Sequence, residues 1–465
     1  FSPRPPRERL PRRPLRPGEQ PLKDGDRVLV VGGGIAGSSF CHQLLSMAQQ
    51  EKRKITVYLI NSTSCNYCGG LITGVAQETL EDVYGLEVPH DLILKKIESC
   101  VYLNQTGSGL VQLHTPMTAI LRTSKFGVPG FDDSIKRRAA SGLMPPWSES
   151  LIDIEPTIVT KILPPAEERP WRITLSKLNP DHTPMELEGE VLVMAAGFKS
   201  LQRPMLKEFQ EATGYQPPPT MPASVTELDT GKAIHNTIGN QMFILDGLLP
   251  GCVVAFIPKG ETWMTVTSLG RKLEKPDLDL IFGHPLVRQY IDLPNASQTP
   301  RCHTICGATV FTGPARRIYG DGWVVIGDLA GHGRVLKDGY YAAFVQGRLA
   351  AETLIYHGAS RSAWERHFHR PLKKFLLDNR VGHGLFRLNR RLQSFPWFSR
   401  FLIHAMREEG RDNPYGGCLQ GGIRALASGE LNYRLIFLLL LAGMLRFALL
   451  HPLLTISSLL KKNNS

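Results

Sequence analysis

A strand pattern that runs directly into a glycine-rich turn is the feature that most constrains this fold. Residues 27–31 are an apolar run typical of a strand, and residues 32–37 read Gly-Gly-Gly-Ile-Ala-Gly. Residues 38–48 follow with the spacing of a helix, and a second apolar run spans 55–60. The order predicts a β-α-β unit with its glycine turn at the start of the helix.

Three glycines of this turn have a physical role in a dinucleotide site. Gly32 permits a tight turn, Gly34 lets backbone amides approach a pyrophosphate, and Gly37 lets helix and strand pack closely. The helix N-terminus then faces the phosphates. We therefore expect a dinucleotide contact from Gly32, Gly34, Ile35, Ala36 and Gly37.

The end of the second strand departs from the usual pattern. Asn61 stands where an acidic residue would hold a ribose hydroxyl, and an amide can still hydrogen-bond but carries no charge. NAD and FAD share this first turn, so the rest of the chain must decide between them. A strand pattern at 323–328 ends in Gly327-Asp328 and is followed by Gly339 and a helical pattern. Asp328 could accept a hydrogen bond from a ribose or ribitol hydroxyl there. A second cofactor-binding segment so far along the chain from the first glycine turn favours FAD.

With these motifs the chain resembles the FAD-dependent geranylgeranyl reductase family, within the p-hydroxybenzoate hydroxylase-like flavoproteins. The match rests on the first glycine turn, on Cys68-Gly69-Gly70, on residues 256–260, and on Gly327-Asp328 with the segments 338–339 and 347–351. Weaker similarities lie at 131–142 and 193–203. The resemblance implies that further FAD contacts come from Asn61, Gly69, Gly70, Arg122, Gly197, Gly327, Asp328, Asp338 and Gly339.

The sequence also differs from that family pattern. Ala196-Gly197 replaces a usual Asp-Gly, Val253 and Ala255 stand where related enzymes carry aromatic residues, and Asp338 replaces a common Glu. No second glycine motif for NAD(P)H is present. The resemblance therefore implies reduction of FAD by surface-bound NAD(P)H or by a reduced carrier.

The expected fold class is α/β, with a Rossmann-type FAD-binding domain, a β-sheet substrate domain and a C-terminal helical, membrane-associated segment. Short β-rich runs between turns agree with a second sheet. The division that we expect is a disordered basic arm at 1–24, a discontinuous FAD-binding domain at 25–100, 120–210 and 305–360, a substrate domain at 101–119 and 211–304, helices at 361–430, and an apolar membrane segment at 431–465.

Reduction of an isolated prenyl alkene needs a proton donor close to the flavin, because the alkene is a poor electrophile. Cys68 is the first candidate, although it could equally be a small buried thiol, and Tyr340 and Tyr341 are alternatives. The spacing of Cys65 with Cys68 and of Cys302 with Cys306 is too imperfect for zinc, so we predict no metal site. A redox contact between Cys68 and Cys306 remains open.

The C-terminus is apolar from Leu435 to Leu460, but Arg446 and Pro452 interrupt it. A simple crossing helix is therefore not expected, and a helix in the interface or a shallow hairpin bent at Pro452 fits better. The alternative is a helix buried in the core or in an oligomer contact. The 54 basic residues exceed the 42 acidic ones, which favours an anionic partner. No aromatic residues interleave the basic runs, so we expect no nucleic acid.

Three functions are compatible with these motifs. The first is reduction of C=C bonds in a prenyl chain of a lipophilic substrate at the membrane, on the side of a reducing, cytoplasmic-type compartment. The second is flavin-dependent monooxygenation of a lipophilic substrate, because the same fold supports oxygen chemistry. The third is a flavin-bearing subunit of a membrane complex. Halogenation is disfavoured by Val253 and Ala255 in place of tryptophans.

Overall fold

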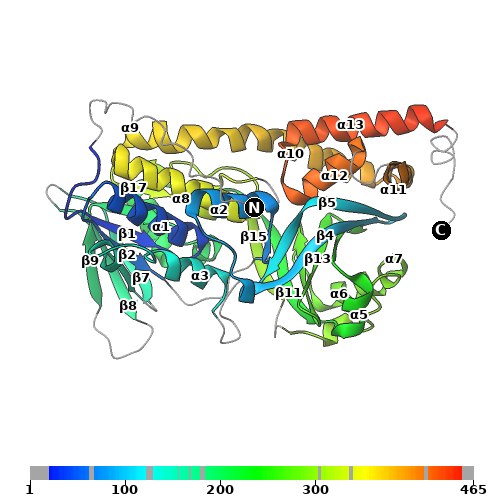
Figure 1. The fold of residues 1–465 in the computed structure, drawn as a ribbon, viewed down its shortest axis with the longest axis horizontal. Coiled ribbons are helices and arrows are strands. Elements are labelled where there is room, and N and C mark those ends of the chain that lie inside the picture. The colour runs from blue at the N-terminus through cyan, green and yellow to red at the C-terminus, as the bar shows by residue number, and fades with distance from the viewer. Residues whose placement is uncertain are drawn as a thin grey trace.

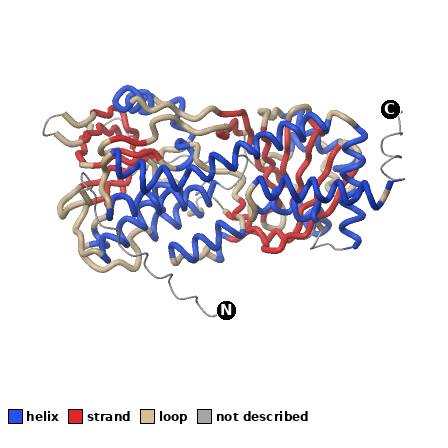
Figure 2. The backbone as a smooth tube through the Cα atoms, turned by 90° about the horizontal axis from the view of Figure 1, so that it is seen from above, coloured by secondary structure: helices blue, strands red, loops and turns tan. Residues whose placement is uncertain are grey.

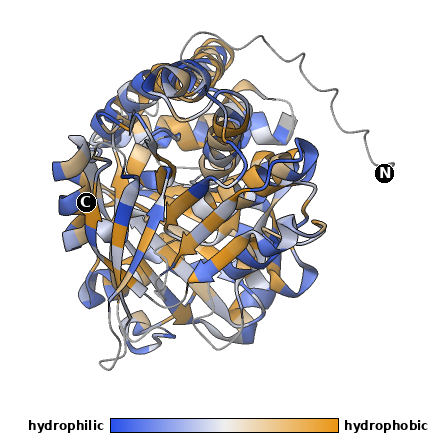
Figure 3. Cartoon of the chain, turned by 90° about the vertical axis from the view of Figure 1, so that its left-hand side faces the viewer, coloured by the Kyte–Doolittle hydropathy of each residue, from blue (hydrophilic) through white to orange (hydrophobic). Residues whose placement is uncertain are grey.

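The molecule is elongated, with two β-sheet regions side by side and a layer of helices along one long side (Figure 1). The computed structural model describes residues 20–61, 68–121, 129–154, 157–166, 169–177, 184–301, 305–334, 339–412 and 417–452. Figure 3 shows hydrophobic residues gathered on the central strands, beneath helices that carry both kinds of residue.

The first sheet has six strands, and its order brings distant parts of the chain together. The order is β16 (Tyr319–Gly320), β17 (Trp323–Val325), β10 (Val191–Met194), β1 (Arg27–Val31), β2 (Thr56–Ile60) and β6 (Leu151–Ile154). All neighbours are parallel except β16 with β17. Residues Val28 to Val30 are fully buried, as expected for a strand covered on both faces. The predicted β-α-β unit is confirmed.

Two helices that follow glycine turns pack against each other beside this sheet. They are α1 (Ile35–Gln50) and α8 (Gly339–Tyr356). A Cβ on Gly347 of α8 would lie 3.0 Å from the backbone nitrogen of Phe40 in α1. The absence of a side chain at this position therefore sets how closely the two helices approach.

The second sheet has eight strands and is mostly antiparallel. The order is β15 (Cys306–Phe311), β11 (Thr220–Asp229), β14 (Trp263–Leu269), β13 (Cys252–Lys259), β12 (Gln241–Leu249), β4 (Ile93–Asn104), β5 (Gly107–Ile120) and β3 (Leu71–Ile72). Among these described strands only β12 and β4 are parallel neighbours. A smaller sheet consists of β7 (Thr157–Leu163), β8 (Trp171–Lys177) and β9 (Met185–Gly189).

Strand pairing differs from the division that the sequence suggested. Residues 71–72 and 93–100, assigned above to the FAD-binding domain, pair in the eight-stranded sheet, and so do residues 306–311. The reason for residues 93–100 is that β4 pairs with β5 in one long hairpin, and pairing between strands cannot be read from the local sequence. The division into domains itself remains a prediction.

Side chains alternate between the two faces of the eight-stranded sheet. Phe256 stacks on Phe282 of helix α6, with ring centroids 4.7 Å apart, so this face packs on helices. Its neighbours Ala255 and Ile257 point the other way, into a cavity described below. The helices outside the C-terminal layer are α2 (Gly74–Tyr84), α3 (Phe131–Arg138), α4 (Pro204–Thr213), α5 (Gly231–Ile238), α6 (Lys275–Gly283) and α7 (Pro285–Arg288).

The C-terminal layer covers both sheet regions when the molecule is viewed from above (Figure 2). It begins with α9 (Arg361–Ala363) and a π-helical turn at Trp364–His369, and continues with α10 (Arg370–Gln393), α11 (Pro396–Asp412), α12 (Cys418–Ser428) and α13 (Tyr433–Leu450). These helices agree with the helical region expected at 361–430, and Trp364, Phe368 and Leu372 are fully buried.

Both ends of the chain differ in part from expectation. The predicted disordered arm extends to residue 24, but Leu22 is buried and its amide donates to the carbonyl of Leu354. That prediction is wrong for residues 20–24, because the apolar Leu22 finds a place against α8; residues 1–19 lie outside the described part. Arg446 does not interrupt α13, since its side chain is exposed, and the helix ends before Pro452.

Candidate functional site

Three turns meet at the carboxyl edge of the six-stranded sheet. Gly32 has φ +115°, and a Cβ there would overlap the carbonyl of Ala195, at the end of β10. A Cβ on Gly37 would overlap the carbonyl of Gly32, so the helix can approach the turn only without a side chain. A Cβ on Gly327, beyond β17, would lie 2.9 Å from the Cβ of Ala36. The first and last glycine turns are therefore in direct contact.

The N-terminus of α1 is open toward this junction. Gly34 is its N-cap, no side chain caps it, and a Cβ at Gly34 would meet nothing within 4 Å. The first amides of a helix have no intrahelical partner and carry a partial positive charge. An uncapped helix end that faces free space fits the pyrophosphate of a dinucleotide.

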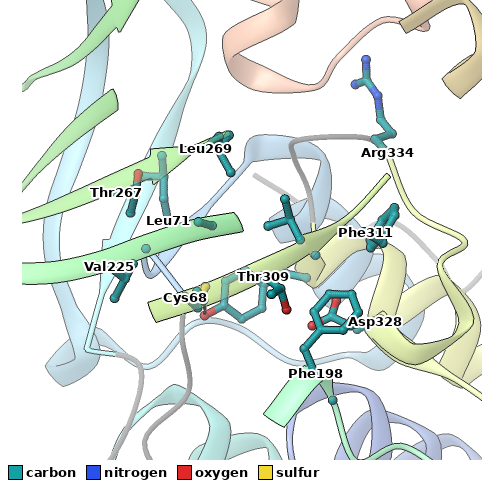
Figure 4. A pocket seen from close by; sticks show the side chains of 18 of the residues that line it. Cys68, Leu71, Phe198, Val225, Thr267, Leu269, Thr309, Phe311, Asp328 and Arg334 are labelled. Carbon is teal, nitrogen blue, oxygen red and sulfur yellow. Dashed lines mark hydrogen bonds between the residues drawn. The ribbon is translucent and has the colours of Figure 1, made fainter. Parts of the chain in front are cut away.

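A cavity of about 1530 Å³ extends from this helix end along the eight-stranded sheet to the C-terminal helices. Figure 4 shows part of this cavity, with Val225, Thr267 and Leu269 of the sheet and Cys68 among the residues that line it. Cofactor and drug-sized pockets usually measure about 300–1,000 Å³. The cavity is therefore large enough for FAD together with a second long ligand.

Asp328 presents its carboxylate to the cavity near Phe198 and Phe311 (Figure 4). Its side chain is exposed to the open volume, while the surrounding protein raises the pKa of its carboxyl to about 6 by desolvation. The amide of the preceding Gly327 donates to the Gln346 side chain at 2.8 Å, which fixes the turn. Asp328 is thus placed to accept a hydrogen bond from a hydroxyl group of a bound ligand.

Cys68 and Tyr340 lie next to each other on the cavity wall. The Cys68 thiol donates to the Tyr340 hydroxyl over 3.6 Å, and the Gly70 amide donates to the Cys68 sulfur over 3.3 Å. Tyr340 also packs edge-on against Phe131, with ring centroids 5.6 Å apart. Two groups able to donate a proton, the Cys68 thiol and the Tyr340 hydroxyl, are therefore adjacent on the cavity wall. Packing against Phe131 holds the Tyr340 ring in position.

Most of the predicted site residues within the described part line this cavity. They are Gly32, Gly34, Ile35, Ala36, Asn61, Cys68, Gly69, Gly70, Gly197, Gly327, Asp328, Gly339 and Tyr340. Gly37 instead allows the close approach of helix and turn. Arg122 and Asp338 fall outside the described residues, so their predicted roles remain untested.

The remaining sequence candidates lie elsewhere or stay apart. Tyr341 packs against Phe375 rather than on the cavity wall. No disulfide joins Cys68 to Cys306. Within the described residues no group of three or more His, Cys, Asp or Glu side chains is arranged to hold a metal ion.

Sequence reasoning missed the far wall of the cavity, which the C-terminal helices provide. Its apolar part comes from α10, α11, α12 and α13. A polar cluster joins this wall to the eight-stranded sheet: Tyr102 of β4 and Asn389 of α10 donate to Asp246 of β12 over 2.9 and 2.7 Å. Burial raises the pKa of the Asp246 carboxyl, although these hydrogen bonds oppose the shift. Residues 436, 440, 443 and 447 have helical spacing that could have indicated a packed face.

No protein family model matches the sequence, and no curated protein matches it. Solved structures with a similar fold include a geranylgeranyl bacteriochlorophyll reductase-like protein from Thermoplasma acidophilum, with 14% identity, a TM-score of 0.58, and coverage of 94% of this chain and 99% of that one. A flavin-dependent brominase has 15% identity and a TM-score of 0.55, and the alignment covers 94% and 98% of the two chains. The p-nitrophenol 4-monooxygenase from Pseudomonas putida has 13% identity, a TM-score of 0.52, and coverage of 91% and 98%.

At these identities the similarity concerns the fold. The chain has the α/β architecture of flavin-dependent oxidoreductases, and the similar structures include a reductase-like protein, a halogenating enzyme and a monooxygenase. One fold therefore serves several reactions, and the residues of the cavity must distinguish between them.

Proposed function

We propose that the protein is an FAD-dependent oxidoreductase that reduces C=C bonds in the prenyl chain of a lipophilic substrate. The observation that supports it most is the continuity of the cavity from the open N-terminus of α1 to the apolar C-terminal helices. One end suits a dinucleotide, and the other suits a long hydrocarbon chain. NAD(P)H or a reduced carrier is the electron source in this proposal.

FAD would lie along the line of glycine turns. The uncapped amides of α1 beyond Gly34 would hold the pyrophosphate. Asp328 would accept a hydrogen bond from a hydroxyl group of the sugar or of the ribityl chain. Gly339 opens α8 toward the same space, since a Cβ there would meet nothing within 4 Å. The donor set thus fits the cofactor that the sequence predicts.

When bound and reduced, FAD supplies a hydride for the alkene. The chain must then supply one proton to the other alkene carbon, so that two hydrogens are added and the double bond is lost. We assign this proton to the thiol of Cys68 or to the hydroxyl of Tyr340, which share one hydrogen bond beside the cavity. The aliphatic side chains of the sheet, such as Val253 and Ala255, leave room for a prenyl chain and exclude water.

Anaerobic reduction followed by mass analysis of the lipid tests this proposal. The purified holoprotein is reduced with dithionite and incubated with a geranylgeranylated lipid in detergent. A gain of two hydrogens per reacted bond supports the reductase. A gain of one oxygen atom when air is admitted would assign the protein to the monooxygenases instead, and an unchanged lipid under both conditions would fit a flavin-bearing subunit without its own turnover.

A further inference from the structure

The helix α13 has two faces of different character. Ile436, Gly443 and Phe447 are buried against the molecule, and a Cβ on Gly443 would lie 2.6 Å from the Cβ of Leu419 in α12. The opposite face carries exposed leucines at intervals of three and four residues, which place them in one stripe. Their side chains are 38% to 81% exposed: Leu435, Leu438, Leu441, Leu445 and Leu449.

The neighbouring helix α10 adds positive charge to the same side of the molecule. Figures 1 and 2 place α10 and α13 along one outer face. Arg380, Arg387 and Arg391 are exposed there and share one face of α10 with the exposed Leu377. In the sequences of α10 and α13 the single acidic residue is Asp378, which accepts the amide of Tyr433 over 2.6 Å.

The cavity reaches the region between these two helices. Its wall includes Leu385, Leu388 and Leu392 from α10, and Phe437, Leu440 and Met444 from α13. Leu388 lies at the border between the cavity face of α10 and its outward face, and it is 44% exposed. The apolar interior and the apolar outer stripe are therefore separated only by the edges of two helices.

We propose that the outward faces of α10 and α13 are a docking surface for an anionic lipid bilayer, and that the substrate chain enters the cavity between them. In this arrangement the leucines of α13 enter the outer hydrocarbon while the arginines of α10 remain among the headgroups. The docking surface stands independently of the chemistry, whereas the entry route rests on the proposed function.

Charge and packing favour this occupant over the alternatives. A symmetric contact with a second copy would bring the arginines of two α10 helices together, and like charges repel. A membrane-spanning α13 would have to give up its contacts with α12 through Gly443. Anionic headgroups neutralise the arginines instead and leave the packed face of α13 undisturbed.

Sedimentation with lipid vesicles tests the surface on the full-length holoprotein. Vesicles of phosphatidylcholine alone are compared with vesicles that contain about one third phosphatidylglycerol. We expect roughly tenfold or tighter binding to the anionic vesicles and a marked loss of binding in about 0.5 M salt. Leu438→Gln with Leu445→Gln should weaken binding roughly tenfold or more, and so should Arg387→Gln with Arg391→Gln.

Control substitutions remove an equally exposed leucine, or two exposed positive charges, at sites away from α10 and α13. Leu280→Gln on α6 removes a leucine that is 63% exposed. Lys207→Gln with Lys232→Gln removes two exposed cations whose side chains are 80% and 66% exposed. These control variants should sediment like the unchanged protein.

Unchanged vesicle binding by the α10 and α13 variants would overturn the docking surface. If the leucine variants dissociate an oligomer in solution and still bind vesicles normally, the stripe is a contact between copies of the chain. The entry route is tested separately, since the docking variants should keep reducing a short, water-soluble prenyl substrate but slow with a vesicle-embedded one. Normal vesicle binding without any reduction would refute the proposed function and leave the surface intact.

Discussion

Gly327 and Ala36 touch across a separation of 291 residues, because a Cβ on Gly327 would lie only 2.9 Å from the Cβ of Ala36. The contact joins the turn after β17 to the first turn of α1. It brings the carboxylate of Asp328 and the uncapped end of α1 onto the wall of one cavity. A single cofactor can therefore contact both.

The contact predicts a coupled effect on stability. Gly327 has φ +74°, so Gly327→Ala adds both backbone strain and a steric clash, and we expect a loss of about 1–3 kcal/mol in the free energy of unfolding. Adding Ala36→Gly to the Gly327→Ala variant should restore the share of the free energy of unfolding that the steric clash removed. Chemical denaturation of the single and double variants measures the coupling, which would be absent if the two effects simply added.

Substitution of Gly34 should separate flavin binding from folding. Gly34 has φ −72° and faces free space, so valine can adopt its conformation, but the side chain would occupy the place of the pyrophosphate. Gly34→Val should weaken FAD binding about 100-fold, the equivalent of one or two charged hydrogen bonds. Flavin fluorescence titration of the apoprotein measures this affinity. Gly283→Val, which also meets nothing within 4 Å, is the control, and full flavin content in Gly34→Val would contradict the site.

Flavin affinity should depend on pH through Asp328. Its pKa is raised from 3.8 to about 6, and the ionised carboxylate is the better acceptor for a ligand hydroxyl. Affinity should therefore be full above about pH 7 and fall as the pH drops through about 6. In the apoprotein the sign is opposite: the raised pKa favours folding at low pH, and this stabilisation is lost as the pH rises from about 4 through 6. Asp328→Asn should flatten both profiles between about pH 4 and 7, and a persistent slope would assign the titration to another group.

Cys68 and Tyr340 can be distinguished by substitutions that retain the flavin. If the thiol gives the proton, Cys68→Ala should lower the rate of alkene reduction about 100-fold or more, while flavin content and the rate of flavin reduction stay normal. Tyr340→Phe removes only the hydroxyl and should keep the packing against Phe131. The rate at which substrate oxidises the reduced flavin in a single turnover measures alkene reduction, and the rate of flavin reduction is measured separately. Full activity in both variants would exclude this pair as the proton source.

The sequence alone determined the local parts of the site. The strand, glycine turn and helix at 27–50 follow from short-range rules, because tight turns and close helix approach need glycine at fixed spacing. Gly327 and Asp328 were found in the same way, from a strand that ends in a glycine. The helical region expected at 361–430 is present as well.

Only the tertiary structure decided which distant segments share the cavity. The apolar C-terminus reads as a membrane segment in sequence, yet Phe437, Leu440 and Met444 form a wall of the cavity. The inward and outward leucines of α13 are chemically identical, so composition cannot tell them apart. Their roles depend on Gly443, which allows α13 to pack against α12 and fixes which face turns inward. Burial is a property of packing between elements, and the local sequence of one helix does not specify its neighbour.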